Sequence, residues 1–247
     1  MSKDWNVLLN DTEIDESMYL TSDSIGPIDA NTDYTIEVIG DFPWGSLTTG
    51  KQPLSNFHDV YFQLPDDVLA DIIETISDFY KQYLEVFRTN DPKQADSLWS
   101  SKEEVTELVE WVASLYDNVE NNEITYYLDF KEFAVGNNHV KVLEDNKLRI
   151  STMINKAFDY HWYAEEIENP IYETDYEFFD LSYDDGKWSV DYYDSYYHDF
   201  DWDFGSELYS IESDPVIIKD SKTNKKSSSS DEPSERLKKQ CYHILTL

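Results

Sequence analysis

Carboxylates recur towards the end of an aromatic-rich segment, residues 174–204, and could bind a divalent cation. These acidic residues are Asp191, Asp194, Asp199, Asp201, Asp203 and Glu207. Calcium prefers several carboxylate oxygens, but this spacing does not match an EF-hand loop. The strict alternation of residues 199–204 (DFDWDF) instead puts the carboxylates on one face of a strand and the aromatic rings on the other. We therefore predict a solvent-exposed acidic face, no metal ligands and no cofactor.

Histidine could supply acid–base chemistry, because an Asp/His pair can act as general acid and base. The histidines are scattered along the chain, at His58, His139, His161, His198 and His243. His161 and His198 lie in segments that can adjoin in a sheet, near Asp159 or Asp199, yet surface or half-buried histidines are the simpler interpretation. The sequence contains no nucleophile elbow, phosphate-binding loop or dinucleotide fingerprint. We therefore predict no catalytic residues and a protein that is not an enzyme.

Aromatic and acidic side chains together indicate a binding surface. Adjacent aromatic residues on a strand point to opposite faces, so about half of them cannot be buried in one core. An exposed surface of this kind suits a glycan, a peptide or a cationic ligand. The candidate ligand-binding residues are Trp162, Tyr193, Tyr197, Asp199, Asp201 and Asp203.

The net charge narrows the classes of partner. The chain has 19 basic and 52 acidic residues among 247, a formal net charge of −33. Nucleic acid and anionic membrane surfaces are disfavoured, because both are bound through clustered Lys and Arg. Cationic ligands or proteins are favoured. No apolar run is long enough to span a membrane, and the N-terminus lacks the apolar core of a signal peptide.

The first 64 residues contain short alternating segments, such as residues 32–42, and are predicted to form a small β-sandwich-like module. We expect a second domain at residues 65–204. The remainder, residues 205–247, loses apolar periodicity and gains Ser and Lys, which predicts a largely disordered tail.

The second domain begins with helical patterns and ends with strand patterns. Apolar residues recur at helical spacing over residues 65–87, a short helix follows Pro92, and a third helix begins near residue 101. Strands are expected at residues 124–133 and 147–158. This order predicts an α+β fold in which three helices pack against a curved antiparallel sheet.

An Asp-Gly pair between alternating segments predicts a tight β-hairpin within residues 174–204. The turn is expected at Asp185-Gly186, where glycine adopts positive φ without steric cost. The residues that should anchor this hairpin in a curved sheet are Phe178, Tyr183, Trp188, Val190 and Tyr192.

Three short motifs and the order of the two modules resemble a known family. Residues 25–28 (IGPI), 33–38 (DYTIEV) and 42–45 (FPWG) are similar to the repeated β modules of TcaA-like proteins, and of the related YvbJ proteins. These are membrane-associated cell-envelope proteins of Gram-positive bacteria linked to glycopeptide susceptibility. The helices and sheet that end in residues 184–190 (DDGKWSV) resemble the NTF2-like domain that closes their ectodomains. The resemblance spans roughly residues 5–200 and includes neither the family's zinc ribbon nor its membrane helix.

The resemblance implies a non-enzymatic, envelope-associated accessory protein that acts in cell-wall homeostasis or glycopeptide response. Its partner would be a wall polymer, a glycopeptide, or a cationic ligand or protein. Two alternatives stay open: an NTF2-like small-molecule enzyme, and a cytosolic acidic protein that mimics DNA, as some anti-restriction proteins do. We expect an extracytoplasmic location if the chain is a piece of a longer protein, and a cytoplasmic one if it is complete.

Overall fold

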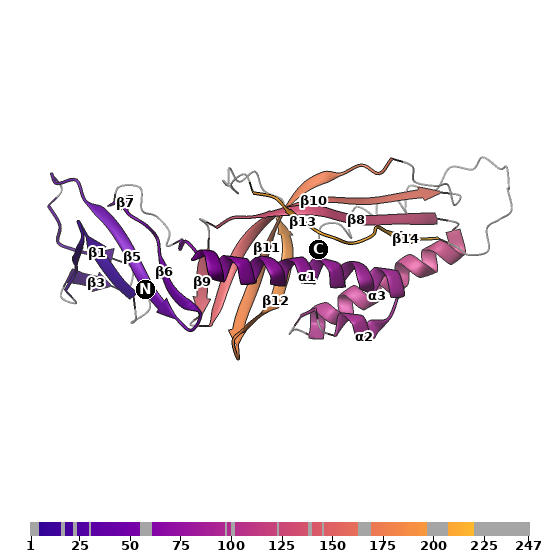
Figure 1. The fold of residues 1–247 in the computed structure, drawn as a ribbon, viewed down its shortest axis with the longest axis horizontal. Helices are drawn as coiled ribbons and strands as arrows, with labels where there is room; N and C mark the ends of the chain where they lie inside the picture. Colours follow the sequence, from indigo (N-terminus) through magenta and orange to yellow (C-terminus); the bar gives the residue numbers. More distant parts are fainter. Residues whose placement is uncertain are drawn as a thin grey trace.

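The computed structural model describes residues 5–15, 18–21, 24–29, 31–54, 61–96, 98–99, 102–122, 124–137, 140–144, 146–162, 169–196 and 207–219. Two units follow one another along an elongated molecule, a small β unit at one end and a larger α+β unit (Figure 1). Every strand pair recorded among the described residues is antiparallel. The predicted α+β class is therefore confirmed.

The described part of the N-terminal unit contains seven short strands, of which five form one sheet in the order β2-β1-β5-β6, with β7 paired to β5. The remaining two, β3 and β4, pair with each other. The strands are β1 (Trp5–Leu9), β2 (Thr12–Glu13), β3 (Tyr19–Thr21), β4 (Ser24–Ile25), β5 (Thr35–Phe42), β6 (Gly45–Thr48) and β7 (Gln52–Pro53). Alternation along β5 buries Ile36 and Val38, as expected for a strand with one covered face.

Three helices open the C-terminal unit: α1 (Asp66–Thr89), α2 (Pro92–Ala95) and α3 (Lys102–Asn122). Helix α1 begins with Asp66 and Asp67, which favour the positive end of the helix dipole, and ends at Asn90 in the left-handed region. Asp91 caps α2 by accepting a hydrogen bond from the Lys93 amide (3.0 Å). All three predicted helices are thus present.

The residues that the structure describes in this unit form a sheet of seven strands in the order β12-β11-β10-β8-β13, with β14 also paired to β8 and β9 to β10. Its strands are β8 (Ile124–Val135), β9 (Lys141–Glu144), β10 (Lys147–Trp162), β11 (Glu173–Asp184), β12 (Lys187–Tyr196), β13 (Tyr209–Ser210) and β14 (Val216–Ile218). Helix α1 runs along the sheet (Figure 1), and Phe79 and Tyr80 on that helix contact Phe179 on β11.

The predicted hairpin is confirmed, with a two-residue turn between β11 and β12. Asp185 and Gly186 both have positive φ (48° and 80°), and Asp184 pairs with Lys187. Trp188, however, is only half-buried. Its ring contacts Tyr183 and Trp44, both at centroid distances of 5.0 Å, so it packs against the N-terminal unit.

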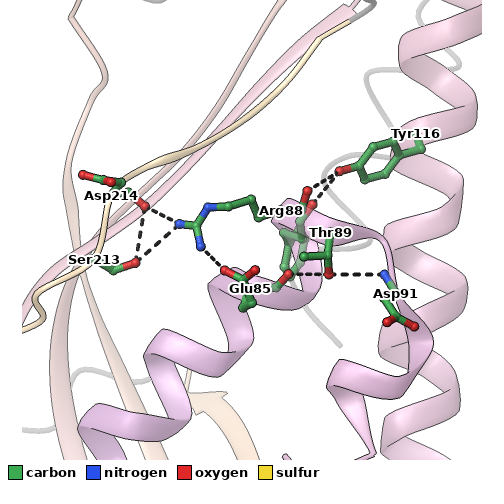
Figure 2. Close-up of polar contacts among 8 residues, drawn as sticks. Glu85, Arg88, Thr89, Asp91, Tyr116, Ser213 and Asp214 are labelled. Atoms are coloured by element: carbon green, nitrogen blue, oxygen red, sulfur yellow. Dashed lines mark hydrogen bonds and ion pairs between the residues drawn. The ribbon is translucent and has the colours of Figure 1, made fainter.

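The prediction of a disordered tail from residue 205 is wrong for residues 207–219. These residues include β13 and β14, which pair with β8 at the edge of the sheet. Arg88 at the end of α1 donates to the Asp214 carbonyl (2.7 Å) and to Ser213 Oγ (3.5 Å), while it forms an ion pair with Glu85 (Figure 2). Val216 and Ile218 are buried, so β14 belongs to the core.

Candidate functional site

A pocket of about 400 Å³ lies between α1, the residues after α2, and β12. Its apolar lining comes from Phe79, Leu98, Trp99, Trp188 and Val190. Its polar lining comes from Thr75, Asp78, Gln82 and Ser189. Aromatic walls beside a carboxylate can hold an ammonium or guanidinium group, through cation–π attraction and through charge.

Helix and strand periodicity place these side chains. On α1, residues 72, 76, 79 and 80 face the sheet and are buried, while Asp78 lies on the exposed flank. On β12, alternation gives Trp188 and Val190 the same face, and their partners Tyr183 and Leu181 share that face on β11. The pocket is the space between this flank of α1 and the edge strand.

A buried ion pair lies in the interior beneath the pocket. Glu177 on β11 has a fully buried side chain, and it accepts hydrogen bonds from Tyr80 (2.6 Å), Tyr193 (2.7 Å) and Lys156 (2.8 Å). Lys156 also contacts Asp175 at 2.9 Å, and the Asp175 side chain is 44% exposed. The chain of contacts therefore runs from a closed interior towards solvent.

This network of contacts raises the pKa of Tyr80, of Tyr193 and of Lys156. Burial, followed by the charge of Glu177, raises the pKa of Tyr80 and of Tyr193 well above the usual value. For Lys156, burial alone would favour the neutral form, but the carboxylates of Glu177 and Asp175 outweigh it, so its pKa is raised as well. At neutral pH the Tyr80 and Tyr193 phenols are therefore neutral and Lys156 is charged.

We expect the free energy of unfolding to be insensitive to the ionisation of Tyr80, Tyr193 and Lys156 below pH 10, and to fall as the pH rises above 10. Each folded-state pKa is raised, so the stabilisation is complete below the unfolded pKa, about 10 for Tyr and Lys, and is lost as pH rises. Tyr192, with a pKa raised to about 12, contributes in the same direction. Absorbance titration at 295 nm with circular dichroism checks this result. Ionisation of every tyrosine near pH 10 with the fold intact would contradict it.

The ion pair and the pocket share an aromatic wall. The ring of Phe79 contacts Trp99 (5.5 Å between centroids) on the pocket side and Tyr193 (5.1 Å) and Tyr83 (5.8 Å) on the interior side. Aromatic rings in edge-to-face or tilted contact attract each other and stabilise the fold. The position of Phe79 therefore depends on Tyr193, which Glu177 holds by a hydrogen bond.

The helices beside the pocket are strongly acidic. Helix α1 carries six acidic and two basic residues, and α3 carries six acidic residues and one basic residue. Asp78 itself forms an ion pair with Lys81 (3.3 Å) in which both side chains are largely exposed, so this pairing is weak. The local field at the pocket therefore favours cations.

The opposite face of the sheet is better covered than the sequence indicated. Tyr126 and Tyr127 are adjacent on β8 and both are buried, one on each face. On the face turned away from the helices, Tyr127 and Tyr172 both donate to Asp129, which is itself buried, and Lys131 lies 3.6 Å from the Tyr172 ring centroid. Adjacent aromatic residues are therefore no proof of an exposed aromatic surface here.

The candidate ligand-binding residues do not form one described site. Tyr193 lies in the interior next to the pocket, whereas Trp162 ends β10 and pairs with Ile124. Ile150 is the β10 residue level with Phe179 and Tyr193, and twelve residues of strand, roughly 40 Å, separate it from Trp162. The other candidates, Tyr197, Asp199, Asp201 and Asp203, lie outside the described residues.

Of the two histidines considered for acid–base chemistry, the structure describes His161. His161 lies 3.6 Å from Asp159, and both project from the face of β10 opposite to Phe158, which packs on Trp111 of α3. This pair is therefore on the far side of the sheet from the pocket. His198 lies outside the described residues. Among the residues that the structure describes, no group of three or more His, Cys, Asp or Glu side chains could hold a metal ion.

Neither the pocket nor the ion pair was predicted from the sequence. One signal was present in the spacing. Asp175 and Glu177 lie at every second position in line with Phe179 and Leu181, so on a strand they must share the face of those apolar residues. Lys156, a charged residue inside a strand, was a second signal. Neither reveals that the two side chains meet, because 21 residues separate them in the chain.

Comparison with known proteins found a family match for the first unit. Residues 2–64 match the family model described as "TcaA protein 3rd/4th domain". No curated protein matches the chain significantly. The crystal structure of the intermembrane space region of the chloroplast protein ARC6 aligns with a TM-score of 0.39 and 10% identity, over 53% of this chain and 97% of that chain. That score is too low to place the two proteins in one fold.

No helix among the described residues is both long and apolar enough to cross a bilayer. The match at residues 2–64 agrees with the resemblance seen in the short motifs of this region. Residues 2–64 are therefore similar to the 3rd/4th domain of TcaA.

Proposed function

We propose that this protein is a non-enzymatic accessory protein of the cell envelope and that the pocket between α1 and β12 binds cationic groups. The TcaA-like domain supports the envelope role, because the resemblance implies proteins of the Gram-positive envelope. The pocket carries the binding proposal, since Trp99 and Trp188 face a space that Asp78 borders. Amino groups of a wall polymer, a glycopeptide or a basic protein have the matching chemistry.

Charge and aromatic surface act at different ranges in this proposal. The field of the acidic chain, with its net charge of −33, raises the local concentration of cations over a Debye length of about 10 Å at 0.1 M salt. Contact with the aromatic walls then selects ligands that place an amine in the pocket. A ligand with the same shape and no charge lacks both contributions.

Calorimetry with a glucosamine tetramer tests the proposal, and its N-acetylated form is the matched neutral ligand. We expect the amine form to bind and the acetylated form not to bind. Asp78→Asn should weaken binding about tenfold, because one charge contact in a partly enclosed site is worth roughly 1.4 kcal/mol.

The control is Asp117→Asn, which removes the same charge from an exposed position on α3 that does not line the pocket. This variant should bind as the unchanged protein does. Binding that is equal for both tetramers, or equally weakened by the two substitutions, would contradict a specific cation site at the pocket.

A further inference from the structure

Among the described strands, β12 is the outermost of its sheet, and the pocket lies beside it. Among the described residues, β11 is the strand that pairs with β12. The three pocket residues that β12 supplies, Trp188, Ser189 and Val190, are consecutive. An edge strand presents backbone donors and acceptors that a further strand can use. The pocket therefore adjoins a row of backbone hydrogen-bonding groups.

The hairpin register shows which residues of β12 direct these groups outward. The Tyr183 amide donates to the Asn146 carbonyl (2.8 Å), on the side of β11 away from β12. Its partner Trp188 therefore belongs to a non-hydrogen-bonded pair of the hairpin. Val190, two residues further on and paired with Leu181, has the same orientation. The N–H and C=O groups of Trp188 and Val190 thus point away from β11.

The backbone and the side chains of Trp188 and Val190 can contact the same ligand. In an antiparallel pair, residues directly opposite each other place their side chains on the same face. A segment paired to the outer edge of β12 would therefore direct alternate side chains, those opposite Trp188 and Val190, towards the pocket. The residue between them, opposite Ser189, would point to the other face of the sheet.

We infer that β12 binds an extended peptide segment by antiparallel strand addition, with a basic side chain of the peptide in the pocket. This inference rests on the proposed cation site and names the ligand class. Strand addition supplies affinity through backbone hydrogen bonds, and the pocket for an alternate side chain supplies specificity. Asp78 and the acidic flank of α1 select Lys or Arg at that position.

A capped pentapeptide that alternates threonine and lysine is the probe, titrated into the full chain by calorimetry. In antiparallel addition, the residues whose side chains face the pocket also donate their amides to β12. N-methylation of the two lysine amides should therefore weaken binding at least tenfold. N-methylation of the second and third threonine amides retains the charge and should change affinity less than threefold.

Two variants of the protein give an independent readout. Val190→Pro removes the outward N–H from an edge strand, where proline is tolerated. Val190→Thr keeps that N–H and nearly the same volume. We expect the proline variant to lose at least tenfold in peptide affinity relative to the threonine variant, with both folded by circular dichroism. The methylated peptides decide the question if the proline variant does not fold.

The outcomes separate this inference from the proposed function. Equal losses for both methylated peptides, or no loss for the lysine-methylated one, overturn strand addition. If the glucosamine tetramer still binds in an Asp78-dependent way, the cation site stands alone. If neither the peptide nor the tetramer binds, both proposals fail.

Discussion

Replacing Glu177 by alanine should lower the free energy of unfolding by about 3–5 kcal/mol, because it leaves a buried ammonium without its main counter-charge. The Glu177 side chain is fully buried and accepts hydrogen bonds from Tyr80, Tyr193 and Lys156. Its loss also removes the carboxylate that accepts from the Tyr80 and Tyr193 hydroxyls, and leaves Tyr80 with only the longer contact to Thr152 Oγ1 (3.4 Å). Asp175, which is 44% exposed, compensates only in part for the lost charge. Urea unfolding at pH 7, followed by circular dichroism, measures the change.

Two further variants test the cause of this effect. Lys81→Ala breaks the exposed pair with Asp78 and should cost less than about 1 kcal/mol. Lys156→Met in the Glu177→Ala background removes the orphaned charge, so part of the lost stability should return. Simple additivity of the two substitutions would show that the ion pair does not dominate.

Trp44→Ala is expected to destabilise the protein by about 3–5 kcal/mol. Trp44 sits in the turn between β5 and β6, is 8% exposed, and stacks on Phe42 with a centroid distance of 5.1 Å. Its other contacts, with Tyr183 (6.1 Å) and Trp188 (5.0 Å), belong to the C-terminal unit. The substitution thus removes packing inside one unit and between the two.

A double-mutant cycle separates these contributions. Trp44→Ala and Trp188→Ala should show a coupling of about 0.5–1.5 kcal/mol, the range for aromatic pairs in contact. Ile171→Ala, at a side chain that is 69% exposed, is the control and should change stability by less than about 0.5 kcal/mol. A coupling near zero would mean that the hairpin and the N-terminal unit do not stabilise each other.

Much of the fold could be predicted because its signals are local. Ile72 and Ile76 on α1 recur at helical spacing, Pro92 begins α2, and Asp185-Gly186 marks the hairpin turn. The three-residue strand β14 escaped prediction, because three residues show no period and its partner Leu128 lies 88 residues earlier. Strand pairing over such a distance leaves no local pattern.

The candidate site was harder to predict for a related reason. Tyr193 was selected, but as part of an exposed surface, whereas its hydroxyl reaches Glu177 in the interior. The pocket joins Asp78, Trp99 and Trp188 from three segments that only the tertiary fold brings together. Likewise, Trp188 was expected inside the sheet, and the residue that covers it, Trp44, comes from the other unit.

The late pairing of β14 has a consequence for biosynthesis. Strand β8 is made early, pairs on one side with β10, and receives β13 and β14 on the other side only at residues 209–218. Until then a growing chain carries β8 with an unpaired edge that includes Tyr126, Tyr127 and Leu128. Such an edge is a template for association with other chains. Pairing of β13 and β14 with β8 therefore protects this edge from association with other chains. A chain truncated before residue 207 would lack that protection.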